Sequence, residues 1–241
     1  MKGKFMLGGF PVIYGLNPFA TETSPSHQLG SIGVTPDGRR FRYARVDAST
    51  ALVAGNLLQS KAENTSDQAL AVAAAAIGAT SIVTTSTVTV DANEYADGYV
   101  VVTVTPGLGH TYRIKSHAAS SAAALTIQLY DPIEVALTTD SRIDLIANPY
   151  NRVIQNPTTA TSCPVGVAVI AAGVDTYTWI QTHGIADVLS EGATAVGQSV
   201  VASTGTAGGV IDAASTTRPV IGMAAAGIAS GENGAIFLTI D

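Results

Sequence analysis

Short segments rich in Thr, Val, Ile and Tyr recur along most of this chain, and Gly, Pro, Asp or Asn stand between many of them. β-Branched and aromatic residues fit the pleated, half-buried surface of a sheet, and the intervening residues are those that form tight turns. Strand-like segments at such short spacing predict a β-sandwich or a β-barrel. In chain order the segments are residues 82–90, 99–105, 111–116, 125–130, 133–137, 142–146, 165–171, 176–182, 199–203, 220–225 and 235–240.

Residues 35–38, Thr-Pro-Asp-Gly, form the clearest turn signal. Proline presets φ for the turn, and Asp-Gly tolerates the positive φ that follows. Strand-like residues flank the turn at 31–34 and 39–46, which predicts a β-hairpin. Residues 66–77 are ambiguous, because their alanines favour a helix that Ser66 could cap, whereas the alternation of Ala and Val also fits a strand.

We therefore expect an all-β fold with two small sandwich-like or barrel-like modules in tandem and at most one short helix. The predicted division is an extended N-terminal arm over residues 1–35, a β domain over 36–150, a linker over 151–164 and a C-terminal β module over 165–241. The linker is predicted from its content of Asn, Pro, Thr and Ser.

The predicted arm contains many large apolar side chains but no lasting period. A disordered tail seldom carries so many apolar groups, so we expect them to be buried against a neighbour, in this chain or in another. Two arginines of the predicted hairpin join them as candidate interaction residues, and the complete set is Phe5, Phe10, Ile13, Tyr14, Phe19, Arg39 and Arg42.

Charged residues make up only 12% of the chain, against roughly 25% in a typical soluble domain. Such a surface suits a protein that is covered by neighbours within an assembly. The net charge of −6 disfavours binding to nucleic acid and to anionic membranes. No run of about 20 apolar residues is present that could cross a membrane.

The one basic cluster consists of Arg39, Arg40, Arg42 and Arg45. Strand alternation places Arg40 and Arg42 on one face and the other two on the opposite face, so the cluster is not one continuous patch. We interpret these residues as solvated or ion-paired arginines at a hairpin or a subunit contact, and not as a nucleic-acid site.

Catalytic and metal-binding motifs are absent from the sequence, including phosphate-binding loops, nucleophile elbows and zinc-protease motifs. His110 and His117 are an odd number of residues apart on a predicted strand, so they face opposite sides and are expected to be structural. Cys163 is the only cysteine, which excludes an intramolecular disulfide, and we expect it to be a small buried residue. We predict no catalytic residue, no cofactor and no metal site.

Trp179, the only tryptophan, shares a strand face with Tyr177 by alternation, and we expect it in the core of the C-terminal module. A carbohydrate-binding β-sandwich would instead need aromatic side chains exposed as a platform. A carbohydrate lyase or hydrolase is the enzyme alternative. The carbohydrate-binding function stays open as an alternative.

Several β-rich segments resemble the capsid decoration proteins of tailed phages. These segments are residues 41–46, 51–57, 112–117, 129–132, 148–151, 164–168, 177–184, 221–224 and 236–238. The resemblance implies a tandem-β homotrimer that binds the major capsid protein on the outside of an icosahedral shell. It implies no catalytic residue. The single cysteine fits synthesis in the reducing cytoplasm of the bacterial host. A tail, fibre or baseplate component is the alternative, although a fibre should show internal repeats and none is found.

Overall fold

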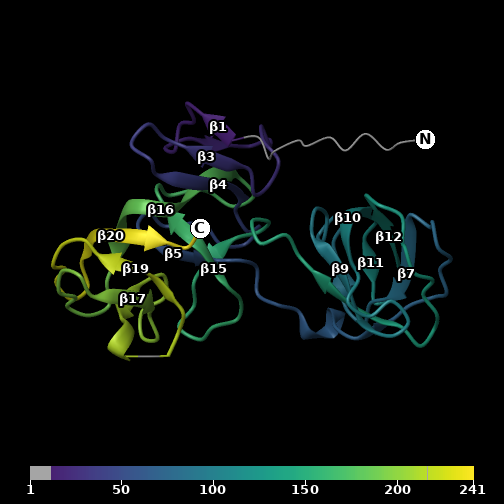
Figure 1. Ribbon diagram of the computed structural model, residues 1–241. Coiled ribbons are helices and arrows are strands. Elements are labelled where there is room, and N and C mark those ends of the chain that lie inside the picture. Colours follow the sequence, from purple (N-terminus) through teal and green to yellow (C-terminus); the bar gives the residue numbers. More distant parts are fainter. Residues whose placement is uncertain (1–11, 216) are drawn as a thin grey trace. The chain divides into compact units, whose positions relative to one another are not determined.

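The computed structural model of the chain describes residues 12–215 and 217–241. Among these residues it contains β-strands and two short 3-10 helices, η1 (Thr65–Asp67) and η2 (Ala213–Ser215), which confirms the predicted all-β class. No helix in the described part of the chain is long and apolar enough to span a membrane. The chain divides into two compact units: unit 1 comprises residues 1–61 and 149–241, and unit 2 comprises residues 62–148 (Figure 1).

This division differs from the one expected from the sequence. Residues 36–61 belong with the C-terminal strands, because the hairpin pairs with a strand about 140 residues later in the chain. Residues 12–34 of the expected arm contribute three strands to the sheet of unit 1. The expected linker, residues 151–164, contributes a further strand and is also part of unit 1. Composition alone does not reveal such distant pairing.

Unit 2 is a small six-stranded antiparallel barrel. Its strands follow the order β6 (Leu70–Ala71), β13 (Arg142–Ile146), β9 (Tyr99–Val104), β10 (Thr111–His117), β12 (Ala124–Leu129) and β7 (Ser81–Thr85). A bridge between Val72 and Thr84 joins the first strand to the last, and the amide of Ala73 donates to the carbonyl of Val83 at 2.9 Å. A separate pair, β8 (Thr89–Val90) with β11 (Ser120–Ser121), lies outside the barrel sheet.

The core of unit 2 follows from strict alternation along its strands. In β12 the residues Leu125, Ile127 and Leu129 are buried, while the residues between them are exposed. Apolar residues of the other strands meet them inside the barrel, among them Ile82 and Ile143. The alternation with a period of two, from which the strands were predicted, therefore also identifies the residues that fill this core.

Unit 1 is built on a twelve-stranded sheet. Its main path runs β1 (Val12–Tyr14), β3 (Ile32–Val34), β4 (Arg40–Arg45), β16 (Tyr177–Leu189), β20 (Asn233–Thr239), β19 (Val220–Ala224), β17 (Ser199–Ala202) and β18 (Val210–Asp212). Four further strands branch from it: β2 (Thr21–Glu22), β5 (Leu57–Gln59), β14 (Ile154–Gln155) and β15 (Pro164–Ala168). The predicted hairpin around residues 35–38 is confirmed, since β3 pairs antiparallel with β4.

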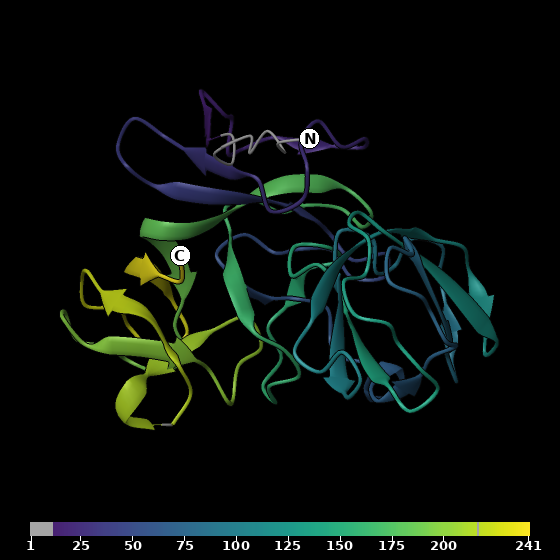
Figure 2. The ribbon, with the colours of Figure 1, turned by 45° about the vertical axis from the view of Figure 1, so that its right-hand side comes forward.

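The 13-residue strand β16 connects the two halves of unit 1. Its first half pairs with β4, and its second half pairs with β20. Figure 2 shows this strand in green, running beneath the purple hairpin and on toward the yellow C-terminal strands. The strand bends at Gly184, whose φ of +85° is one that side chains other than glycine rarely adopt.

One core cluster of unit 1 is aromatic and consists of Phe41, Tyr43 and Trp179. The prediction that Trp179 is a core residue is confirmed, because only 4% of its surface is exposed. Its neighbours are not only C-terminal, since Ile13 and Leu16 pack against the cluster. These two residues of the expected arm are therefore part of the core of their own chain.

Candidate functional site

A hollow of about 210 Å³ opens in unit 1 beside the bend of β16. Apolar side chains from distant parts of the chain form its wall, with Phe19 from the segment between β1 and β2, Val167 from β15 and Ile185 from β16. Polar side chains reach the same hollow, namely Arg39, Gln181 and Asp187. The hollow thus combines an apolar wall with a few fixed polar groups, as binding sites commonly do.

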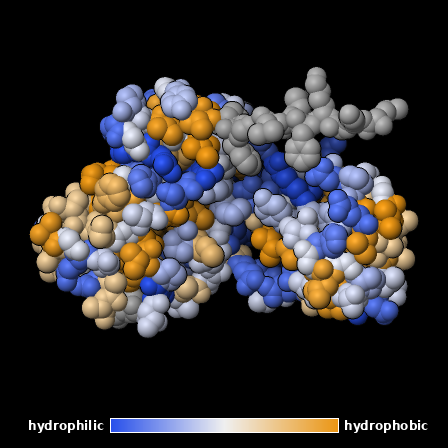
Figure 3. All heavy atoms as spheres, in the orientation of Figure 1, coloured by the Kyte–Doolittle hydropathy of each residue, from blue (hydrophilic) through white to orange (hydrophobic). Residues whose placement is uncertain are grey.

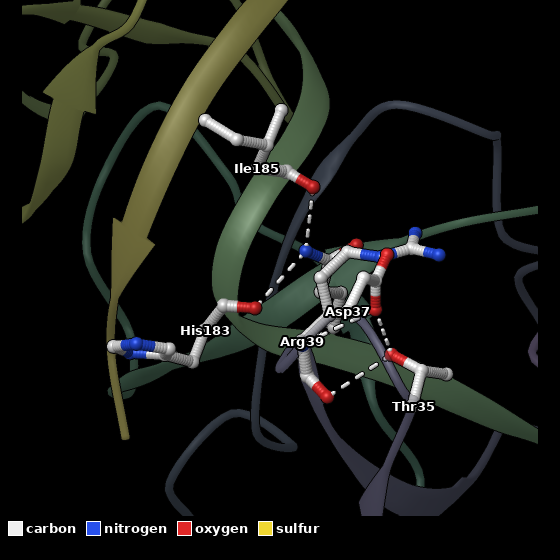
Figure 4. Close-up of polar contacts among 6 residues, drawn as sticks. Thr35, Asp37, Arg39, His183 and Ile185 are labelled. Atoms are coloured by element: carbon white, nitrogen blue, oxygen red, sulfur yellow. Dashed lines mark hydrogen bonds and ion pairs between the residues drawn. The ribbon is translucent and has the colours of Figure 1, made fainter.

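The side chain of Gln181 fixes the bend of β16. Its Nε2 donates to the carbonyl of Ile185 at 2.8 Å and to that of His183 at 3.1 Å (Figure 4). The register with β4 shifts between Gln181 and His183, so these carbonyls fall where regular pairing with β4 ends. Gln181 is buried, and these two hydrogen bonds satisfy its own side-chain amide, which burial would otherwise penalise.

Arg39 stands at the rim of the hollow in a defined position. Its Nε lies 2.7 Å from Oδ2 of Asp37, and its guanidinium carbon lies 5.6 Å from the ring centroid of Phe41. The hydroxyl of Thr35 also donates to Asp37. The hydrogen bonds from Thr35 and Arg39 hold the pKa of Asp37 below its ordinary value, so the pair stays ionised. Arg39 therefore presents a charge that is already balanced.

Asp187, which also lines the hollow, is likewise held by a hydrogen bond. The amide of Asn233 donates to its Oδ2 at 2.8 Å. Gly55 makes room for this contact, because a Cβ at that position would lie 2.1 Å from Nδ2 of Asn233. The φ of Gly55 is +78°, which independently favours glycine.

An exposed row of apolar side chains, here called the apolar row, begins at the hollow and crosses three neighbouring strands. It consists of Ile185 in β16, Phe237 in β20 and Met223 in β19, which are direct partners in the sheet register. Their exposed fractions are 48%, 37% and 47%, while the alternate residues Ala186 and Ile236 face the core. In Figure 3 orange and tan spheres lie among pale ones over the part of the molecule that carries these strands.

The lining of the hollow has groups that can support non-covalent binding. The acidic and the basic side chain of the hollow, Asp187 and Arg39, each have a partner, and the rest of its lining is apolar or amide. Within residues 12–215 and 217–241, no group of three or more His, Cys, Asp or Glu is placed to hold a metal ion. The arrangement can bind an apolar side chain by burial and orient it through hydrogen bonds at the rim.

Two of the predicted interaction residues, Phe19 and Arg39, meet at this hollow. Ile13 is half-buried against the aromatic cluster, and Tyr14 is exposed on the edge strand β1. Phe5 and Phe10 lie outside the described residues.

Arg42 lies elsewhere and is engaged within the chain. It makes two contacts with the carboxylate of Asp241, at 2.5 and 2.7 Å, and donates to the carbonyl of Gly30 at 2.9 Å. The hydrogen bonds between the two side chains, assisted by their opposite charges, raise the pKa of Arg42 and lower that of Asp241. Arg45 likewise pairs with Asp175 at 2.9 Å. The prediction of ion-paired arginines at a hairpin is confirmed for Arg39, Arg42 and Arg45.

Sequence reasoning missed the apolar row and the polar residues of the hollow. In the second half of β16, outward Ile185 and inward Val188 are both apolar, and β20 shows the same with Phe237 and Leu238. Alternation alone therefore could not say which face of these strands is covered. The only available signal was the presence of large apolar residues on both faces of neighbouring strands.

A buried polar cluster in unit 2 centres on Asp67, which is fully buried. Its carboxylate accepts hydrogen bonds from the Tyr95 hydroxyl at 2.5 Å, the Ser86 hydroxyl at 2.8 Å and the Asn64 amide at 3.0 Å. Burial, followed by the hydrogen bond to Asp67, raises the pKa of Tyr95. Every donor is supplied by the chain itself, so we assign this cluster to stability.

The predicted structural role of His117 is confirmed, whereas the expectation for Cys163 is wrong. His117 is buried, and its Nε2 accepts from the amide of Tyr95 at 3.0 Å. Cys163 is exposed, because it directly precedes β15 where that strand begins at Pro164, and its carbonyl accepts from the amide of Ser60.

Comparison with known proteins gave no match among family models, curated proteins or solved structures.

Proposed function

We propose that this chain is a non-catalytic structural protein of a tailed-phage particle that decorates the capsid and stabilises it by binding across capsid subunits. The observation that carries the proposal is the apolar row beside the hollow, on the outer face of the sheet of unit 1. The low charge of the chain and its resemblance to decoration proteins support the same function.

Exposed apolar surface of this kind favours the binding of a partner protein that removes it from water. Full burial of a large apolar side chain contributes about 1.5–3 kcal/mol, so covering the remaining exposed part of each row residue contributes on the order of 1 kcal/mol. The hollow adds a shaped depression that can accept one protruding side chain. Together they suit a modest contact that is repeated many times over a lattice.

Repetition explains how a modest contact can stabilise a shell. A protein that binds the assembled lattice, but not free subunits, shifts the equilibrium toward the lattice by mass action. Each decorating copy that spans two subunits must be released before they separate. Strong individual contacts are therefore not required.

The aromatic side chains that could have stacked against a sugar are not available at the surface, which argues against the carbohydrate-binding alternative. Trp179 and Tyr43 are both buried in the aromatic cluster, where a sugar ring cannot stack on them. A tail component would share the composition and the exposed row, and the experiment below separates it from a capsid protein.

Co-sedimentation with bare shells and with isolated tails of the phage that encodes the chain tests the proposal. We expect the wild-type protein to pellet with shells and to raise the temperature at which they disassemble. Ile185→Glu places a charge in the apolar row and should weaken binding, whereas Ile77→Glu, at a turn residue of unit 2 that is 68% exposed, should not. Binding to tails alone, or to neither particle, would contradict the proposal.

A further inference from the structure

We propose that the hollow and the apolar row of one chain bind the N-terminal segment, residues 1–11, of a second copy of the same chain. This inference rests on the proposed function and names the partner that covers the apolar row: a neighbouring copy on the same shell, so that the row favours shell binding by linking the copies to one another. It concerns self-association, which can be measured without shells.

The acceptor surface is continuous, because Ile185 belongs to both the hollow and the apolar row. Phe237 and Met223 extend it across two further strands. Strands in a sheet lie about 4.8 Å apart, so the row is about 10 Å long. The hollow, at about 210 Å³, has room for several waters, since one water needs about 10–15 Å³ on this measure, and an entering side chain would displace them.

The N-terminal segment has the chemistry to fill this surface. It reads Met-Lys-Gly-Lys-Phe-Met-Leu-Gly-Gly-Phe-Pro and lies outside the described residues. Phe5 and Phe10 are five positions apart and can be separated by at most about 18 Å, which is enough to cross the row. Lys2 and Lys4 bring positive charge to a chain whose net charge is −6 and whose hollow contains the carboxylate of Asp187.

The direction of β1 favours a second copy over the same molecule. β1 runs parallel to β3, with Val12 opposite Ile32 and Tyr14 opposite Val34. The Val34 end is the hairpin turn, beside Arg39 and the hollow. The chain enters β1 at the other end, so its own segment would have to reverse and return along the hairpin. A segment from a neighbouring copy needs no such reversal.

Such a contact joins two different surfaces. Contacts of this head-to-tail kind close into rings when the rotation between copies permits, and otherwise extend into open chains. The homotrimer implied by the resemblance is one such ring.

Complementation between two full-length variants tests the inference. The segment variant carries Phe5→Ser and Phe10→Ser and keeps an intact acceptor surface. The row variant carries Ile185→Glu and keeps an intact segment. Cys163, the only cysteine, is exposed and accepts a fluorescent donor or acceptor dye on each variant. Circular dichroism checks that both variants are folded, and Phe237→Ser replaces the row variant if it is not.

We expect the wild-type chain to self-associate at about 10–100 μM, because a contact of this size is smaller than a standard interface of about 1,600 Å². Each variant alone should associate at least about tenfold more weakly. A mixture of the two should regain energy transfer, because the intact segment of the row variant binds the intact surface of the segment variant. Ile77→Glu is the matched control and should associate as the wild type does.

Three results would overturn the inference: a wild-type chain that stays monomeric, single variants that associate as strongly as wild type, or a mixture without energy transfer. Weakening by Ile77→Glu to the same degree would also overturn it, since the effect would not be specific to the row. The proposed capsid function fails separately, through loss of shell binding by the wild-type chain. A wild-type protein that stays monomeric but still binds shells would contradict the proposed self-association and leave the proposed capsid function intact.

Discussion

The indole of Trp179 lies edge-on to the ring of Tyr43 on the neighbouring strand, with ring centroids 5.2 Å apart. Both side chains are buried, and the segment between β1 and β3 covers them through Leu16 and Leu29. The pair thus joins the N-terminal and C-terminal parts of unit 1 in one core.

Trp179→Ala should lower the free energy of unfolding of unit 1 by about 3–5 kcal/mol, since it leaves a large cavity in a packed core. Denaturant unfolding followed by circular dichroism measures this change. Unchanged stability would show that Trp179 is not a core residue.

The contact between Glu22 and Tyr43 should make stability depend on pH. Hydrogen bonds from the hydroxyls of Ser26 and Tyr43 lower the pKa of Glu22 in the folded chain. A carboxylate with a lowered folded pKa stabilises the fold above its unfolded pKa and loses that contribution as the pH falls. The melting temperatures of wild type and Glu22→Gln should therefore differ at pH 7, and the difference should begin to shrink near the unfolded pKa of about 4.3 and disappear as the pH falls below the lower folded pKa. A difference that stays constant from pH 7 to pH 3 would exclude this role.

The hydroxyl of Tyr95 should matter more for stability than that of Tyr130. Tyr95→Phe removes a donor from the buried carboxylate of Asp67, and hydrogen bonds to charged groups contribute about 1.5–3 kcal/mol. Tyr130 donates to Asp97 at 3.0 Å from an exposed position, so Tyr130→Phe should cost less than about 1 kcal/mol. Denaturant unfolding of the two variants compares these contributions. Equal losses would contradict the assignment of the Asp67 cluster to stability.

Gly55→Ala should destabilise unit 1 by two separable effects. The positive φ of Gly55 costs an L-residue roughly 1–2 kcal/mol. The added Cβ also collides with the amide of Asn233, and this part should be relieved in the double variant with Asn233→Ala. Thermal melting of the two single variants and the double variant separates the effects. A double variant that shows only the sum of the single losses would mean that the collision is not important.

The sequence was sufficient for features that depend on local pattern. Turn chemistry at residues 35–38 predicted the hairpin, and alternation placed Trp179 with Tyr177 on a buried face. The division into units was not predictable in this way, because it depends on β4 pairing with β16, far along the chain. The hollow escaped prediction for the same reason, since Phe19 and Ile185 meet only after that sheet has formed.

We propose that this chain decorates a phage shell. The most direct test of this proposal is a cryo-electron microscopy reconstruction of bare shells incubated with excess purified protein, compared with shells incubated with Ile185→Glu. We predict additional density on the outer surface, bridging capsid subunits, that is present with the wild-type protein and reduced with the variant. Shells that remain bare at saturating concentrations of wild-type protein would contradict it.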